Sequence, residues 1–166
     1  KVIYKFILGV LLVALGSFLG YLFGRRYRKR KQFFAQFCKF NDCFLAEITY
    51  ARRPLSQFLT SGSYCGEFAL LIDDYMQNVE QASSFAELIQ KDSEYSFLKS
   101  EDKGWIVDYF YMLGRGDSQS QKTYFQSQKE RIESSRAAAE KEDKRYADLY
   151  IKLGFLCGLF ILILIL

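Results

Sequence analysis

Apolar residues are concentrated at the two ends of the chain. Residues 6–23 are eighteen uncharged, mostly apolar residues, close to the length that crosses the hydrocarbon core of a bilayer. Residues 149–166 are apolar apart from Lys152, whose long side chain can place its charge at the membrane surface. We therefore predict a transmembrane helix at 6–23 and a C-terminal transmembrane or membrane-inserted helix at 149–166.

Each apolar end has an alternative interpretation. A cleaved signal peptide fits the N-terminal run less well, because the basic cluster follows the apolar run and no small-residue cleavage site precedes that cluster. The C-terminal run is short for a full crossing, so a shallow or re-entrant insertion is the alternative there.

Residues 32–150 have the spacing of helices that bury one face, with apolar residues every three or four positions. The first stripe consists of Phe33, Phe37, Phe40, Phe44 and Ile48. Further helices are predicted at 54–59, 65–79, 84–91 and 105–113, and a last long helix from about 117. No stretch alternates like a strand. The predicted fold is all-α, an antiparallel bundle of about six helices flanked by an N-terminal and a C-terminal transmembrane helix.

The last helix carries apolar residues at seven-residue spacing. They are Phe125, Ile132, Ala139, Tyr146 and Leu153. The second apolar position that a two-stranded coiled coil needs in each heptad is polar here. We therefore predict a narrow stripe that packs on the bundle or on the first long helix, with Asp117 or Ser118 capping the helix start.

Positive charge is concentrated in residues 24–31, directly after the first apolar run. This basic collar contains Arg25, Arg26, Arg28, Lys29, Arg30 and Lys31. Because positive charge stays on the cytoplasmic side of membranes, residues 32–150 are predicted to be cytoplasmic, with the collar at anionic lipid. Residues 32–150 hold 14 basic and all 19 acidic residues, so we predict no binding to nucleic acid.

The residues that usually carry catalysis or bind metals are sparse. The chain has no His, and its four Cys form no Cys-x-x-Cys pair, so we predict no enzyme, metal or cofactor. Two acidic pairs, Asp73-Asp74 and Glu101-Asp102, could share protons or bind a cation, but such pairs are usually solvated charges. We consider them candidates for docking a partner.

Three groups of residues, in this order, resemble the stage III sporulation protein AB family. They are Glu47-Ile48-x-Tyr50 with Pro54-Leu55, then Leu113-Gly114-x-Gly116-Asp117-Ser118 with Gln121, then Tyr150-x-x-Leu153-Gly154 before an apolar end. The resemblance covers nearly the whole chain, because both apolar ends lie at the expected places.

The resemblance implies a sporulation protein of the mother-cell membrane around the forespore. Such a protein is a platform or adaptor subunit of a transenvelope, secretion-like channel complex between mother cell and forespore. Its soluble domain is similar to that of the platform protein of type II secretion and type IV pilus systems, so the implied partners are a cytoplasmic secretion-type ATPase and other channel subunits. The alternative is a lipid-binding or membrane-shaping helical protein without an ATPase partner.

Overall fold

The computed structural model describes residues 2–51, 53–78 and 82–165. Within them, it leaves the side chains of residues 2–10, 12, 51, 82, 83, 164 and 165 undescribed. Over the described ranges the chain is helical and contains no strand, which confirms the predicted all-α class. It forms two compact units: the helix pair, Lys1–Lys31 with Ala138–Leu166, and the bundle, Gln32–Ala137.

Six helical elements were predicted and six are found when the last rod is counted as one. They are α1 Val2–Ala46, α2 Leu55–Ser61, α3 Glu67–Asn78, α4 Ala82–Lys91, α5 Ser100–Tyr111, and α6 Ser118–Glu142 continued by α7 Asp148–Ile165. The π turn η1, Glu47–Ala51, follows α1, and a second π turn, η3, Asp143–Ala147, joins α6 to α7. A short 3-10 turn, η2, spans Ser93–Tyr95. Val79, in the predicted third helix, lies outside the described residues.

One predicted boundary is wrong by five residues. We expected a helix from Trp105, but α5 begins at Ser100. The acidic side chains of Glu101 and Asp102 fall in its first turn, where negative charge is favourable beside the free backbone N–H groups. The polar residues before Trp105 therefore belong to the start of the helix.

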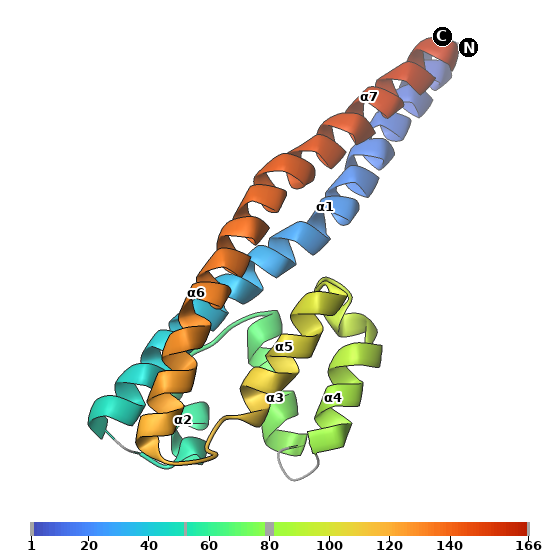
Figure 1. Ribbon diagram of the computed structural model, residues 1–166. Coiled ribbons are helices and arrows are strands. Elements are labelled where there is room, and N and C mark those ends of the chain that lie inside the picture. The colour runs from blue at the N-terminus through green and yellow to red at the C-terminus, as the bar shows by residue number, and fades with distance from the viewer. Residues whose placement is uncertain (1, 52, 79–81, 166) are drawn as a thin grey trace. The chain divides into compact units, whose positions relative to one another are not determined.

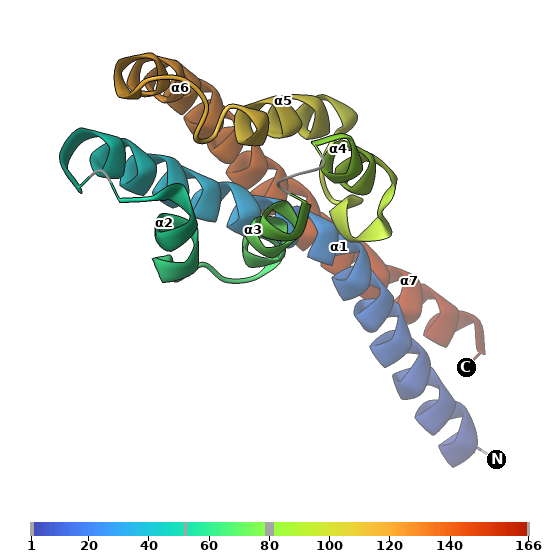
Figure 2. The ribbon, with the colours of Figure 1, turned by 90° about the horizontal axis from the view of Figure 1, so that it is seen from below.

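The bundle is built around the second half of α1. Figure 2 shows this part of α1 running between α2 and α3 on one side and α5 and α6 on the other. Its predicted stripe is confirmed as core: Phe33, Phe37, Phe40 and Phe44 are all buried, while Ile48 at the π turn is half-buried. Each large ring removes extensive apolar area from water, so this aromatic stripe is the main source of bundle stability.

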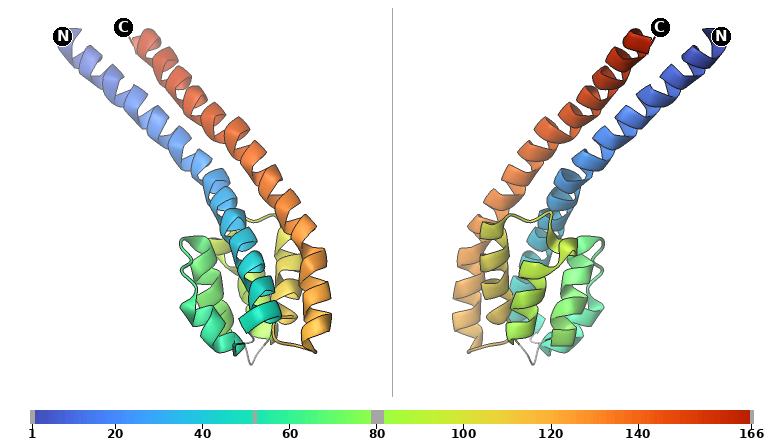
Figure 3. Two further views of the ribbon diagram at one scale, coloured as in Figure 1. Left: turned by 90° about the vertical axis from the view of Figure 1, so that its left-hand side faces the viewer. Right: turned by 90° about the vertical axis from the view of Figure 1, so that its right-hand side faces the viewer.

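Helices α3, α5 and α6 each bring rings to that stripe. Phe37 lies against Phe68 of α3 and stacks on Trp105 of α5, with ring centroids 5.4 and 5.5 Å away. Phe44 meets Phe125 of α6 edge-on at 4.9 Å. Helices α3, α4 and α5, green to yellow in Figure 3, lie next to one another, with α4 in contact with both others.

In the helix pair, α7 runs beside the first half of α1 (Figure 1). The two backbones touch: a Cβ added to Gly154 would overlap the backbone oxygen of Gly16, and one on Gly20 would overlap that of Tyr150. The motif Gly16-x-x-x-Gly20 therefore packs against this chain's own α7. Small residues at such crossings let two apolar helices approach closely.

The predicted seven-residue stripe holds only as far as the π turn η3. Phe125, Ile132 and Ala139 are buried as expected, and half-buried Tyr146 stacks on Tyr27 of α1, but the closest approaches beyond it are made by Ala147 and Gly154. Leu153, which we predicted to face inward, is 46% exposed. A π turn adds one residue to the helical repeat, so the inward face shifts by one position after it.

One described helix, Ser118–Ile163, contains a stretch long and apolar enough to cross a membrane, judged by length and composition. This is the rod that ends in the predicted C-terminal span. No second such helix is found among the residues searched. Because the side chains of 2–10 and 12 lie outside the described residues, the predicted span at 6–23 stays a prediction.

Candidate functional site

The first part of the candidate site is the reversal of the chain between α1 and α2. Glu47, the first residue of the π turn, is only 7% exposed. Its Oε1 accepts hydrogen bonds from the backbone N–H of Arg53 at 3.0 Å and from Nε at 2.9 Å, and Nη2 of Arg53 donates to Oε2. One carboxylate thus holds both the backbone and the side chain of the residue before Pro54.

The charges of this pair support each other. The hydrogen bond from Arg53 lowers the pKa of the Glu47 carboxyl, and the same contact raises the pKa of the Arg53 guanidinium. Both groups are therefore ionised at neutral pH. Because its lone pairs are occupied, the Glu47 carboxylate is poorly suited to proton transfer and well suited to fixing the backbone.

The second part is the corner between α5 and α6. Gly114 and Gly116 have φ angles of 73° and 85°, in the left-handed region that favours glycine. A Cβ on Gly114 would also lie only 2.9 Å from Cδ2 of Leu55 in α2. Gly114 therefore serves both the sharp turn and the close packing of this corner on α2.

Asp117 caps the helix that follows. Its Oδ1 accepts a hydrogen bond from the backbone N–H of Ser120 at 2.7 Å. Hydrogen bonding by Ser120, first through its side chain and then through its backbone, lowers the pKa of the Asp117 carboxyl. The side-chain amide of Gln121 donates back to the Gly116 carbonyl at 3.4 Å. Of the two caps that the sequence allowed, the structure uses Asp117 and not Ser118.

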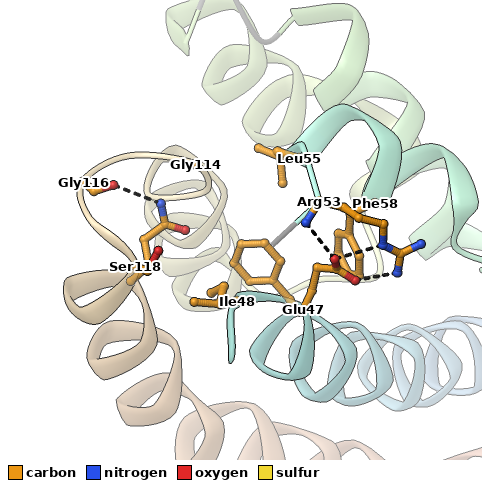
Figure 4. A pocket seen from close by; sticks show the side chains of 10 residues that line it. Glu47, Ile48, Arg53, Leu55, Phe58, Gly114, Gly116 and Ser118 are labelled. Atoms are coloured by element: carbon orange, nitrogen blue, oxygen red, sulfur yellow. Dashed lines mark hydrogen bonds and ion pairs between the residues drawn. The ribbon is translucent and has the colours of Figure 1, made fainter. Parts of the chain in front are cut away.

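The two parts enclose one pocket of about 280 Å³, which we call the corner pocket (Figure 4). Its apolar lining comes from Phe44, Ile48, Leu55 and Phe58. The remaining lining residues are Glu47, Arg53, Gly114, Gly116, Ser118 and Gln121. Seven of the residues that carried the family resemblance, separated by up to about seventy positions in sequence, thus line one pocket.

The other resemblance residues lie around it or elsewhere. Tyr50 is 85% exposed and lines an adjoining hollow of about 540 Å³ that shares Glu47, Arg53 and Phe58 with the corner pocket. The carbonyl of Pro54 accepts the first backbone bond of α2, and Leu113 is buried in the core. Gly154 belongs to the helix pair and packs on Gly16.

Three lining residues were not among the predicted site residues. Phe44 and Phe58 looked like core in the sequence, and Arg53 looked like part of a helix break. The signal for Arg53 was indirect: an acidic residue at an apolar-spaced position needs a cation, and Arg53 is one of the two that follow before Pro54.

The basic collar divides into paired and exposed residues. In the helix pair, Nη1 of Arg30 lies 2.6 Å from the Glu142 carboxylate, and Nζ of Lys31 lies 2.8 Å from that of Asp143. Arg28 is half-buried, with its guanidinium over the Tyr21 ring at 4.6 Å, and Lys29 is half-buried as well. Arg25 and Arg26 are exposed.

The four acidic docking candidates differ in exposure. Asp73 and Glu101 are exposed. Asp74 is half-buried and accepts a hydrogen bond from the Tyr95 hydroxyl, and Asp102 is only 6% exposed. No group of three or more Cys, Asp or Glu among the described residues is arranged to hold a metal ion.

Comparison with curated proteins and with solved structures gives no match. The family model described as stage III sporulation protein AB matches residues 5–166. That range includes both apolar ends and all the residues of the corner pocket. The chain therefore belongs to the stage III sporulation protein AB family.

Proposed function

We propose that this sporulation protein is a membrane-anchored platform subunit whose corner pocket docks a cytoplasmic secretion-type ATPase. The ATPase would thereby be held at the channel complex that links mother cell and forespore. The apolar ends, 6–23 and 149–166, would fix the chain in the mother-cell membrane around the forespore, with the bundle in the cytoplasm. The other subunits of the channel complex would be its membrane partners.

The observation that carries the proposal is the convergence of the resemblance residues on one pocket. The pocket lining combines four apolar side chains with the polar side chains of Arg53 and Gln121, a combination typical of protein interfaces. Its volume of about 280 Å³ accommodates one or two side chains of a partner. The Glu47–Arg53 pair and the glycine corner hold the walls in place without offering a reactive group.

The exposure of the Tyr50 ring favours a protein as the partner. An aromatic ring that is 85% exposed and lines the hollow adjoining the corner pocket gains little from the fold and much from being covered by another protein. Tyrosine is enriched among interface residues that carry most of the binding energy. Tyr50 is therefore the residue at which docking can be tested without disturbing the core.

The acidic surface is a second candidate for the same docking. Only Asp73 and Glu101 of the four predicted residues are exposed, so only these two can meet a partner directly. Buried Asp102 and half-buried Asp74 would act through the fold of the bundle. The charge reversals Asp73→Lys and Glu101→Lys therefore test this surface separately from the corner pocket.

The test is capture of the ATPase by the full chain, purified in neutral detergent from sporulating cells. Tyr50→Ala should weaken capture at least about tenfold, because the exposed ring would be lost from the interface. Tyr111→Ala is the matched control, since Tyr111 is also an exposed tyrosine of the bundle but lies outside both hollows.

If Tyr50→Ala captures the ATPase as well as the parent does, but Asp73→Lys and Glu101→Lys do not, then the docking surface is the acidic face and not the corner pocket. If the parent chain captures no ATPase at all, the platform function itself is wrong. Melting curves that match the parent would show that the variants are folded.

A further inference from the structure

The helix pair brings four exposed cations from distant parts of the sequence to one level. Gly24 of α1 lies against Ala147, and the Tyr27 ring stacks on Tyr146 with centroids 5.2 Å apart. Residues 24–28 and 144–147 are therefore neighbours. Among them, Arg25, Arg26, Lys144 and Arg145 are all exposed, and we call these four the basic belt.

The four belt residues are exposed, whereas Arg30 and Lys31 of the same helix pair form ion pairs within it. The carboxylates of Glu142 and Asp143 are both held by cations of α1, at 2.6 and 2.8 Å. Arg30, one of those cations, is 5% exposed. These two carboxylates are thus engaged by Arg30 and Lys31, while the belt lies on the surface, where Asp148 at the start of α7 is also exposed.

The belt also marks the edge of an exposed apolar surface. On α1 the exposed large apolar side chains of the helix pair run from Leu11 to Phe23, directly before Arg25. On α7 they begin at Leu149, shortly after Arg145. Cations from both helices therefore stand where apolar surface ends, at the same level on both helices.

Tyrosine side chains occupy the same level. Tyr27 stacks on Tyr146 and on Tyr150, with centroids 5.2 and 6.1 Å apart. Aromatic rings with a polar end are enriched where a membrane meets water. A ligand that matches the whole surface has to combine hydrocarbon with a negatively charged group at its boundary.

We propose that the basic belt binds the phosphate groups of anionic lipids at the surface of the bilayer that holds the apolar ends. Guanidinium groups donate paired hydrogen bonds to phosphate oxygens, and three of the four belt residues are arginines. A bilayer surface supplies several such phosphates in one plane, which fits cations spread over two helices. The inference goes beyond ATPase docking and does not depend on it.

The experiment uses the full chain in neutral detergent, titrated with phosphatidylglycerol and separately with phosphatidylcholine. The belt variant is R25Q/R26Q/K144Q/R145Q. The control is K39Q/K91Q/K103Q/K122Q, which removes the same charge from the bundle. Parent and control should bind phosphatidylglycerol with equal affinity, and the belt variant should bind it at least about tenfold more weakly. Binding of phosphatidylcholine should be the same in all three.

A second variant tests charge against loss of structure. R25K/R26K/R145K keeps the four positive charges but not the paired guanidinium bonds, so its affinity for phosphatidylglycerol should lie between those of the parent and the belt variant. Equal affinity of the belt variant and the parent would overturn the proposal. Competition by inorganic phosphate at the concentrations at which phosphatidylglycerol binds would also overturn it, because the belt would then bind free anions.

Discussion

A carboxylate that is almost fully covered needs a cation nearby, and Glu47 obtains one from Arg53, six residues further on. The two residues do not depend on each other equally, because Arg53 remains partly exposed while Glu47 is buried. Removing the arginine would strand the carboxylate, whereas removing the carboxylate leaves an arginine that water can solvate. The pair thus depends mainly on Glu47 being ionised.

This dependence predicts an acid-sensitive contribution to stability. The pKa of Glu47 is lowered in the folded chain from its ordinary value of 4.5, so its contribution is fully present above about pH 4.5 and is lost as pH falls through the lowered folded pKa. Glu47→Gln cannot titrate. We expect the variant to melt about 3 °C lower than the parent at pH 7 and the gap to close toward pH 3.

Melting curves of both chains at several pH values in neutral detergent check this. Glu67, an exposed glutamate of α3, provides the control variant Glu67→Gln, whose offset from the parent should not follow the same pH dependence. A constant gap between Glu47→Gln and the parent from pH 7 to pH 3 would contradict the assignment.

The cap at Asp117 gives a second prediction at the scale of one residue. Asp117→Ala should lower the melting temperature by about 3 °C, because the Ser120 N–H loses its acceptor at the start of α6. Asp117→Asn keeps an oxygen in the same place and should melt close to the parent. If the alanine and asparagine variants melt alike, hydrogen bonding by the cap is not what holds this helix start.

At the scale of elements, the helix pair depends on backbone-to-backbone contact. Gly154→Val should destabilise the pair by about 1–3 kcal/mol, because the new side chain would overlap the backbone of Gly16 and neither backbone can yield without separating the helices. The measurement is thermal unfolding of the full chain in detergent, followed by helical circular dichroism.

Leu156→Val is the comparison for this prediction. Leu156 lies two residues away on α7 and is exposed, so trimming it should leave the melting temperature nearly unchanged. Equal melting of Gly154→Val and the parent would mean that the two helices do not pack closely in the molecule in solution.

The helices and turns also show which parts of the fold could be predicted from the sequence. The six helices could be predicted because each carries a 3.6-residue apolar pattern, such as the Phe33 to Phe44 stripe. The π turn η3 could not, because the residues from Asp143 to Ala147 are ordinary helix formers. Only packing against α1 decides where the extra residue goes, so Leu153 was wrongly placed inside.

At the scale of the whole molecule, the sequence singled out most of the residues that line the corner pocket but not their assembly. Glu47, Gly114 and Gln121 stood out in the sequence, yet their shared pocket depends on contacts between helices far apart in the chain. Asp102 was predicted to be exposed because polar residues usually are, but in the folded chain it is buried. Burial of single polar residues follows from tertiary contacts and not from local pattern.

The π turn between α6 and α7 has a consequence for how this chain could have arisen. An added residue inside a helix is what a single-codon insertion produces. Without the added residue, this stretch would be a regular α-helix, and the residue that is now Gly154 would stand at the inward position of the repeat from Ala139. The π turn therefore absorbs the added residue locally, so its gain or loss needs no compensating change at the two glycines.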